Sequence, residues 1–397
     1  MIKKWLKKLD SFVAKIAIYI IYVYQWTISP DKWILSVFFK GKICAHEPHC
    51  SEYWVRVLKR YGFFNWMPML LDRVLHCLPS NRKMYDPDHY RVVFFSSAEI
   101  GAPFLEELVN DKRFEVVGVV TQEDKPVGRG LKLTPNVIKT KALELWIALD
   151  DIYTPNNINP EKSQEGEDFY EWLQQKAPDY CVVIAYWKIL PQSILDVPIF
   201  GSINVHGSLL PKYRWASPLQ SVFLNKDQES WLSIMRMDAW MDSWAIIDKL
   251  AFKIPFEWTV KDLIERLMQI GPDFLDDVLW MYAKNEIQAV PQKETAATYC
   301  KKIIKQDWEI NPMRDEIIDI YSKYRAYAIW PKVWFMHKDK KVVVEKLVLD
   351  EVWYMSLQHA PLWDEKYELN PCIKELILKP EWKNWIDFKS FKNWYLK

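Results

Sequence analysis

A short segment near the middle of the chain carries the side chains best suited to catalysis. In INVHGSLLPKYR, Asn204 and His206 stand two positions apart at the end of an expected strand. Alternate residues of a strand point to the same side, and open α/β sheets place their ligands at the carboxyl ends of strands. Asp238 and Asp242 follow in an expected loop. An amide, an imidazole and a carboxylate from two connections could together carry out acyl transfer.

For Asn204 or His206 alone, the default interpretation is a polar residue satisfied by backbone at a strand end. The whole string is more informative. NVHGSLLP, together with MDAWMDSWAII around Asp242, resembles the formyltransferase family that uses 10-formyltetrahydrofolate. The resemblance covers residues 91–397. It implies that Asn204, His206 and Asp242 are the catalytic trio and that 10-formyltetrahydrofolate is the formyl donor.

The implied reaction explains these residue types. An amine attacks the formyl carbon, and negative charge develops on the formyl oxygen. The Asn204 amide and the His206 imidazole can donate hydrogen bonds to that oxygen, as in an oxyanion hole. Asp242, acting with His206, is expected to remove a proton from the amine and to deliver one to the folate nitrogen. Positioning of two large substrates supplies much of the acceleration.

Two segments are implied to border the folate: AYWKILP and the loop that follows His206. Their candidate residues are Ala185, Tyr186, Ser208, Leu209, Leu210 and Pro211. Without the resemblance these residues would be interpreted as ordinary ends of core strands. The resemblance implies instead that their backbone groups bind the pterin and that apolar side chains form its walls.

Two basic features favour initiator methionyl-tRNA as the formyl acceptor. TQEDKPVGRGLKLTPNVIK resembles the acceptor-stem loop of the tRNA-specific members, and its Lys125, Arg129 and Lys132 suit RNA phosphates. Lys301 and Lys302 open a C-terminal region that resembles the RNA-binding domain of those members. A solvated loop is the alternative for the first feature. The alternative functions are formylation of a small amine, such as an amino sugar, and an inactive scaffold.

The elements that must position these residues alternate between strands and helices from Arg91 onward. RVVFF, FEVVGVVTQ, PDYCVVIAYWKILP and GSINVHGSLLP are expected strands with helical stretches between them. This alternation predicts a Rossmann-like, doubly wound α/β domain with a parallel sheet over residues 91–292. A helix over 313–327 and several short strands then predict a small OB-like β-barrel domain over residues 298–397.

Residues 1–88 are expected to form a separate module. Residues 1–90 carry a formal charge of +7 and the remainder −6, which indicates that the first part meets an anionic surface. A lysine-rich start and an apolar run from Ile16 to Tyr24, too short to span a bilayer, predict a helix in the membrane interface. A buried helix of a small soluble domain is the alternative.

This module resembles the bacterial membrane-protein insertion efficiency factors. The residues that carry the resemblance include Tyr24-Gln25, Ile28-Ser29-Pro30, PHCSEY at Pro48–Tyr53, Tyr61-Gly62 and Asp86-Pro87. It implies a role in helping inner-membrane proteins insert, with a membrane-protein insertase as a partner, whereas the anionic membrane surface is expected from the charge. The chain is therefore expected to be a cytoplasmic monomer, peripherally associated with the inner face of the cell membrane.

The six cysteines are spread through a long chain, which is not the pattern of a disulfide framework. Cys44, Cys50 and Cys77 lie near histidines and could bind zinc, but the spacing matches no standard zinc finger. Packed cysteines without a metal are the preferred interpretation.

The chain has 22 Trp and only 10 Gly, although about 28 Gly are usual at this length. Glycine is used where the backbone needs positive φ or approaches a ligand closely. We therefore expect that UGA codons written as Trp are read as Gly in the cell, and that the chain with Trp has crowded or displaced indoles around Asp242. In the formyltransferase pattern, Gly stands at the positions of Trp187, Trp215, Trp240 and Trp244; further positions suited to Gly are Trp66, Trp146, Trp382 and Trp394.

Overall fold

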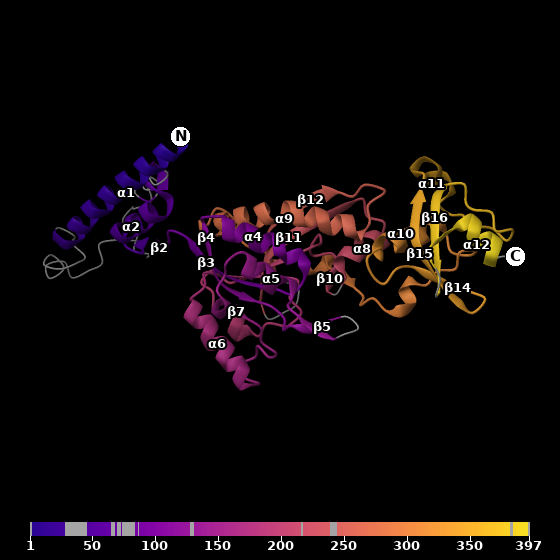
Figure 1. Cartoon of the computed structure of the whole chain (residues 1–397), viewed down its shortest axis with the longest axis horizontal. Helices are drawn as coiled ribbons and strands as arrows, with labels where there is room; N and C mark the ends of the chain where they lie inside the picture. Colours follow the sequence, from indigo (N-terminus) through magenta and orange to yellow (C-terminus); the bar gives the residue numbers. More distant parts are fainter. Residues whose placement is uncertain are drawn as a thin grey trace. The chain divides into compact units, whose positions relative to one another are not determined.

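The structure is a computed structural model. It describes residues 2–27, 46–64, 68–69, 73, 84–85, 87–127, 131–215, 217–238, 244–381 and 384–395. The chain divides into two compact units, Met1–Val92 with Leu108–Val117 and Val93–Glu107 with Gly118–Lys397. Figure 1 shows the elements of both units, coloured along the sequence.

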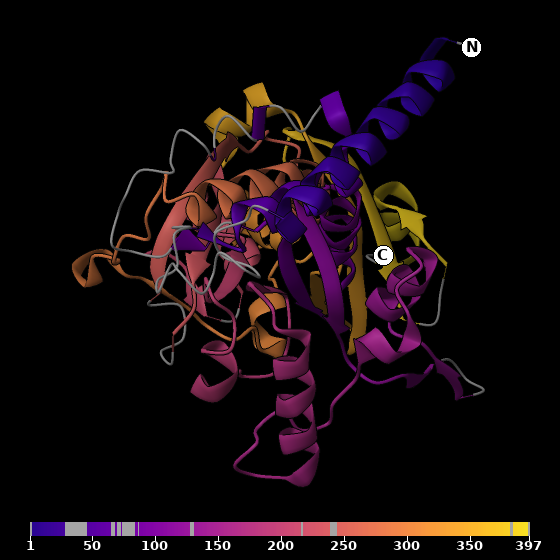
Figure 2. The same ribbon diagram turned by 90° about the vertical axis from the view of Figure 1, so that its left-hand side faces the viewer.

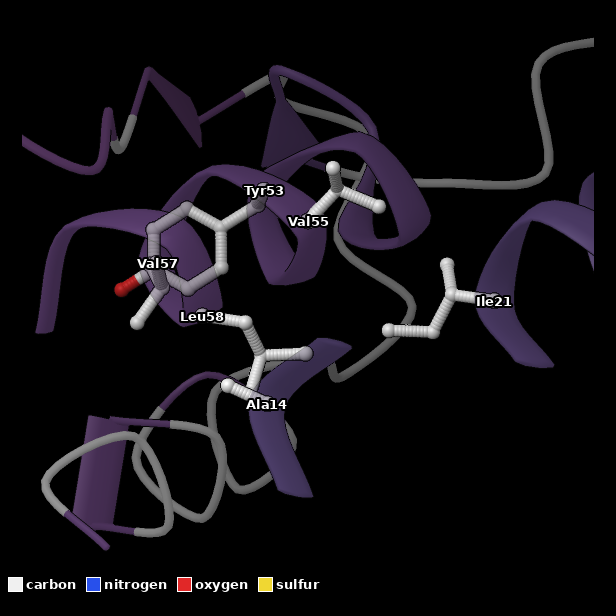
Figure 3. Packing of buried hydrophobic residues seen from close by; sticks show 6 residues of the cluster. All are labelled: Ala14, Ile21, Tyr53, Val55, Val57 and Leu58. Atoms are coloured by element: carbon white, nitrogen blue, oxygen red, sulfur yellow. The ribbon is translucent and has the colours of Figure 1, made fainter. Parts of the chain in front are cut away.

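Two helices form the centre of the first unit, α1 (Ile2–Thr27) and α2 (Cys50–Tyr61). α1 confirms the helix predicted for the basic start of the chain. Ala14 and Ile21 on one side of α1 pack with Tyr53 and Leu58 of α2 in an apolar core (Figure 3). α2 ends at Gly62, whose φ of +79° suits glycine and whose amide donates to the Leu58 carbonyl. A short parallel pair, β1 (His46–Glu47) and β2 (Met84–Tyr85), completes the described part.

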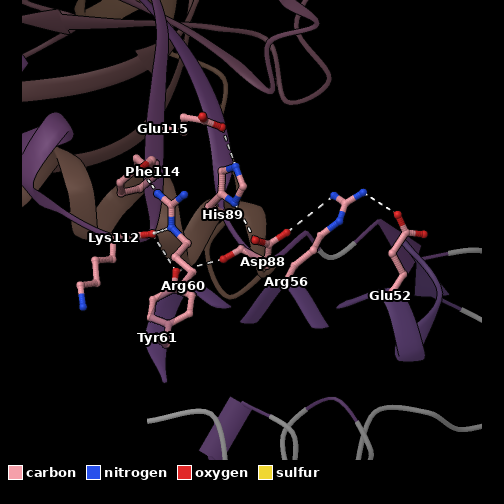
Figure 4. Close-up of polar contacts among 9 residues, drawn as sticks. All are labelled: Glu52, Arg56, Arg60, Tyr61, Asp88, His89, Lys112, Phe114 and Glu115. Atoms are coloured by element: carbon pink, nitrogen blue, oxygen red, sulfur yellow. Dashed lines mark hydrogen bonds and ion pairs between the residues drawn. The ribbon is translucent and has the colours of Figure 1, made fainter. Parts of the chain in front are cut away.

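The C-terminal end of α2 is bound to the backbone of a turn at residues 112–114. The Arg60 guanidinium donates to the carbonyls of Lys112 and Phe114 at 2.8 and 2.7 Å. The Tyr61 hydroxyl lies 2.7 Å from the Lys112 carbonyl and 3.0 Å from the Asp88 carbonyl (Figure 4). These bonds join the end of α2 to the backbone of the turn and to that of Asp88.

Within the described residues, no three His, Cys, Asp or Glu side chains are placed to hold a metal ion. Cys50 is half-buried at the start of α2, while Cys44 and Cys77 lie outside the described residues. None of the described helices has the length and apolar character needed to cross a membrane.

A seven-stranded sheet positions the candidate site. Its strands, in order across the sheet, are β12 (Ala245–Lys253), β11 (Glu229–Arg236), β9 (Ser202–His206), β8 (Tyr180–Ile184), β3 (Tyr90–Ser96), β4 (Phe114–Val120) and β7 (Ile152–Tyr153). The predicted α/β architecture is confirmed. β8 pairs with β9 in parallel, and so does β4 with β7.

The predicted wholly parallel sheet is wrong at one edge, where β11 is antiparallel to both β9 and β12. A parallel crossover needs a dozen or more residues. Only eight residues separate the end of β11 from the start of β12, so the chain can only turn back there. The sheet is therefore mixed.

Helices pack on this sheet through close contacts. α9 (Val260–Ala283) starts with a capping box between Thr259 and Asp262. A Cβ on its Gly271 would collide with the Phe104 ring of α4 (Ala102–Asn110), so glycine allows the two helices to meet. Phe169 of α6 packs edge-on against Phe95 of β3. The remaining helices of this region are α5 (Val137–Glu144), α6 (Gln164–Lys176), α7 (Gln192–Leu195) and α8 (Pro218–Leu224).

The C-terminal region contains a four-stranded antiparallel sheet in the order β14 (Trp334–His337), β15 (Lys340–Leu349), β16 (Ile373–Pro380) and β17 (Ile386–Asp387). The predicted strands at 340–349 and 373–378 are confirmed, and the predicted helix is α10 (Ile317–Ala326). α11 (Glu351–Leu357) and α12 (Phe388–Tyr395) complete it. Closure of these strands into a barrel stays a prediction, and so does the three-domain division.

His89 bridges two carboxylates in the first unit. Its ring nitrogens lie 2.8 Å from Asp88 and 2.7 Å from Glu115 (Figure 4). Burial lowers the pKa of His89, but the hydrogen bonds to the two carboxylates outweigh burial and raise the pKa to about 8. The protonated ring therefore stabilises the folded chain.

A His89→Gln substitution should remove a pH dependence of stability. Because the folded pKa lies above the unfolded value of 6.5, the stabilisation is complete below about pH 6.5 and is lost as pH rises through about 8, by roughly 1 kcal/mol. Urea unfolding at about pH 6 and pH 9 measures the free energy of unfolding at the two pH values. His359→Gln, which alters an exposed His–Glu pair, is the matched control. An equal pH dependence in native chain and His89→Gln would contradict this role.

Candidate active site

β9 presents the two polar residues singled out from the sequence. It lies between β8, where Val183 is the parallel partner of Asn204, and β11, where Ser233 is opposite His206. Both Asn204 and His206 are half-buried, so each reaches the surface from a strand fixed on both sides. The predicted placement of this pair at the carboxyl end of a strand is confirmed.

The His206 ring is oriented by backbone. Its Nε2 lies 3.3 Å from the Tyr213 carbonyl. A carbonyl only accepts, so Nε2 carries the hydrogen, and in the neutral ring Nδ1 is left as an acceptor. Tyr213 is itself held by its amide, which donates to Thr298 Oγ1 at 3.0 Å, and by its hydroxyl on Asp227. In this arrangement the neutral imidazole is suited to accepting a proton.

Asp242 lies outside the described residues, as do Trp240 and Arg129, and convergence of the trio stays a prediction. One flank of the Asp242 loop is described. Trp244 is buried and packs in one apolar cluster with Leu210, which follows His206 in the chain. The loop that carries Asp242 therefore ends against the segment that follows His206.

The loop after His206 is held by its own side chains. The Ser208 hydroxyl donates to the Lys212 carbonyl at 3.1 Å, and the Ser208 carbonyl accepts from the Ser233 hydroxyl at 2.6 Å. The side chains of Ser208 and Leu210 are fully buried. Leu209 and Pro211 are half-buried and are therefore the accessible residues among these four.

The second predicted folate segment follows β8. Ala185 is exposed with a φ of +47°, and its carbonyl accepts from the Ser97 amide at 3.3 Å. The Tyr186 ring packs edge-on against Phe95. Among the described residues, neither the Tyr186 hydroxyl nor the Ser97 hydroxyl has a partner, although both are buried. Ser97 follows the end of β3, and Tyr186 follows the end of β8.

Part of the predicted basic loop is a hairpin. β5 (Lys125–Val127) pairs with β6 (Lys132–Thr134) in antiparallel register, so the prediction of a flexible loop is wrong for the two arms. In this hairpin Lys125 is opposite Thr134 and Val127 is opposite Lys132. Both lysines are exposed, and the hairpin projects from the sheet of its unit in both views (Figures 1 and 2).

Sequence reasoning missed a buried arginine beside the site. Arg214 is 2% exposed and donates twice to Glu294, at 2.9 and 2.8 Å, and twice to Gln292. β10 (Arg214–Trp215) also pairs in parallel with β13 (Tyr299–Cys300). About 80 residues separate these partners, so no local pattern could have revealed them.

This pairing borders a hollow of about 530 Å³. Lys212 and Tyr213 line one side, and Tyr299 and Lys301 line another. Since Tyr213 also orients His206, the hollow adjoins the candidate site. Of the two predicted C-terminal lysines, Lys301 lines this hollow, and Lys302 is exposed next to it in the chain.

Comparison with known proteins gives two family matches. Residues 90–279 match the formyl transferase model, and residues 13–89 match the model of the putative membrane protein insertion efficiency factor. The methionyl-tRNA formyltransferase of Caldicellulosiruptor saccharolyticus is 34% identical over 258 residues, 64% of this chain and 79% of that protein. The enzyme of that name from Trichormus variabilis is 37% identical over 241 residues, which cover 60% of this chain and 68% of that protein.

Solved structures show a similar fold. A crystal structure of HypX from Aquifex aeolicus matches with a TM-score of 0.51 and 12% identity, over 78% of this chain and 49% of that one. HypX from the same organism in complex with tetrahydrofolic acid matches with a TM-score of 0.50 and 11% identity, over 78% of this chain and 48% of that one.

Proposed function

Because this chain belongs to the methionyl-tRNA formyltransferase family, we propose that it transfers the formyl group of 10-formyltetrahydrofolate to the methionine amine of initiator methionyl-tRNA. The observation that carries the proposal is the position of Asn204 and His206 at the end of β9. Beside them, where the neighbouring strands end, Ser97 and Tyr186 keep buried hydroxyls without partners among the described residues. These hydroxyls suit a ligand rich in hydrogen-bonding groups, such as a pterin.

In the proposed mechanism the methionyl amine attacks the formyl carbon while the bond from that carbon to the folate nitrogen breaks. The Asn204 amide donates to the formyl oxygen as charge develops on it. One proton leaves the amine, and one reaches the folate nitrogen, so the products are formylmethionyl-tRNA and tetrahydrofolate. His206 Nδ1, which the Tyr213 contact leaves as an acceptor, receives a proton with Asp242 as its partner.

Acceptor RNA is proposed to contact the β5–β6 hairpin and the hollow beside His206. Lys125 and Lys132 are exposed on the hairpin, with Arg129 between them in the chain. Lys301 lies at the hollow, on the side of the site where Tyr213 orients the catalytic ring. The C-terminal region, proposed to close as an OB-like barrel, would hold the rest of the RNA, and the enzyme would act as a monomer.

Substitution of the trio should impair chemistry rather than folding. Asn204→Ala, His206→Ala and Asp242→Ala are each expected to lower kcat by about 100-fold or more, because each removes a group that acts on the formyl oxygen or a proton. The assay follows formylation of charged initiator tRNA, with small amines tested as rival acceptors. Asp238→Ala, in the same loop, is the control. Near-native activity of Asp242→Ala would contradict the assignment.

Substitution in the hairpin should affect tRNA alone. Arg129→Ala and Lys132→Ala are expected to raise the KM for tRNA several-fold and to reduce its salt dependence, because each removes a phosphate contact. Folate affinity, measured by calorimetry, should stay unchanged. If folate binding weakened to the same extent, the hairpin would belong to the folate site.

For the N-terminal module we propose attachment to an anionic membrane surface, where it would assist an insertase. The specific observation is the outer face of α1, which repeats exposed apolar residues at helical spacing although its other face is already buried against α2. The residues of this exposed face are Phe12, Ile16, Tyr19, Ile20, Val23 and Trp26. Such a face suits the boundary between headgroups and acyl chains.

The full chain should bind vesicles that contain phosphatidylglycerol, and less so at high salt. Neutralising Lys3, Lys4, Lys7 and Lys8 by Gln is expected to weaken binding at least about tenfold, because basic residues near the surface contribute about 1 kcal/mol each. Sedimentation with vesicles measures the fraction of chain bound, and phosphatidylcholine vesicles are the control. Unaltered binding of the four-Gln variant would contradict an electrostatic anchor.

A further inference from the structure

The first unit contains a basic hollow of about 470 Å³ that neither the proposed transfer reaction nor the exposed face of α1 uses. Four Lys and Arg side chains line it against two carboxylates, so it is positive before His89 is counted. The lining residues are Arg56, Lys59, Arg60, Pro87, Asp88, His89, Arg91 and Glu115.

Two basic groups of this hollow, Lys59 and Arg60, are held in place by uncharged partners, whereas Arg56 is paired with carboxylates. Arg60 donates to two backbone carbonyls, which position the guanidinium but do not cancel its charge. Lys59 donates to the Tyr22 hydroxyl at 3.2 Å and lies over the Tyr22 ring. Arg56 reaches Glu52 at 2.7 Å and Asp88 at 3.7 Å (Figure 4). Preorganised donors of this kind suit a phosphate group.

Lys59 also connects the hollow to the apolar face of α1. Its partner Tyr22 belongs to α1 and adjoins the exposed Val23. A molecule with a phosphate at Lys59 and hydrocarbon along α1 would satisfy both features. We propose that this hollow binds the phosphate of an anionic lipid headgroup. This proposal rests on the membrane attachment proposed above.

The test uses the full chain and soluble dihexanoyl phosphatidylglycerol, with binding measured by calorimetry. The native chain and Lys59→Arg should bind it, and the double variant Arg56→Gln with Lys59→Gln should bind about tenfold or more weakly. Lys112→Gln removes an exposed charge of the same unit outside the hollow, and it should bind as the native chain does.

Three outcomes would overturn the proposal: equal weakening by Lys112→Gln, no weakening in the double variant, or equally tight binding of inorganic phosphate, which would indicate a free-phosphate site. Failure of the proposed membrane attachment is distinguished from failure of this headgroup site by the vesicle sedimentation experiment. In that case the native chain would not sediment with vesicles, whether or not it binds the soluble lipid.

A second inference rests on backbone geometry. Trp146, which follows α5, has a φ of +62°, and Trp215 in β10 has a φ of +84°. Bulky L-residues rarely adopt this left-handed region, whereas glycine enters it at no steric cost. Trp146 gains little burial in return, because its side chain is 94% exposed; the Trp215 side chain is 51% exposed, and its ring lies 4.9 Å from the Tyr299 ring between centroids.

α5 ends in a hydrogen-bond pattern that strongly favours glycine. The Trp146 amide donates to the Leu143 carbonyl at 3.1 Å, and the Ile147 amide donates to the Ala142 carbonyl at 3.0 Å. This pair of bonds is the Schellman motif, whose left-handed residue is usually glycine. Trp146 occupies that position.

Among the described residues, Trp146 and Trp215 are two of the twelve residues other than glycine that have positive φ. The chain also has 22 Trp and 10 Gly. We infer that the codons for Trp146 and Trp215 are UGA codons read as glycine in the cell. Not every tryptophan is of this kind: Trp363 is 3% exposed and packs against Phe335 and Phe388.

The test reads these codons and the masses of the matching peptides from protein isolated from its source organism. We expect glycine at 146 and 215 and tryptophan at 363; tryptophan at 146 and 215 would overturn the inference. In the recombinant chain, Trp146→Gly and Trp215→Gly should each raise Tm by about 2–4 °C as strain is released. Trp363→Gly should lower it. A lower Tm for the first two variants would also count against the inference.

Discussion

The hydrogen bonding of β9 is the constraint on which the site depends. Parallel pairing with β8 brings the end of β9 beside the segment of Ala185 and Tyr186, and antiparallel pairing with β11 fixes the opposite side. A one-residue slip would turn Asn204 and His206 to the other face of the sheet. The buried Ser233, which is opposite His206 and donates to the Ser208 carbonyl, ties this register to the following loop.

The parts of the fold with local signals could be predicted from the sequence. The strands predicted at 91–95, 114–122, 201–211 and 340–349 contain short β-branched or aromatic runs, and the structure has a strand at each of these places. The mixed edge of the sheet could not be predicted from the alternation of elements, because that alternation says nothing about strand direction. The short connection between β11 and β12 excludes a parallel crossover between those two strands; the antiparallel pairing of β11 with β9 is known only from the structure.

The candidate site was predictable where one segment supplies it and hidden where distant segments meet. Asn204 and His206 belong to one string and share one strand. The Tyr213 contact that orients His206 depends on a chain reversal, and the Arg214–Glu294 pair joins residues 80 positions apart. Burial also separates two neighbours that look alike in sequence, since Leu210 belongs to a core cluster whereas Leu209 stays half-exposed.

The pairing of β10 with β13 has a consequence for the ancestry of this chain. The Thr298 hydroxyl oxygen accepts a hydrogen bond from the Tyr213 amide, and the Thr298 carbonyl accepts one from the Arg214 amide. Residues at the start of the C-terminal region therefore hold the loop beside His206. A recombination point between 292 and 300 would separate these partners. The formyl-transferring segment and the C-terminal region are therefore expected to be inherited together. Exchange of the C-terminal region alone would leave the loop beside His206 without this support.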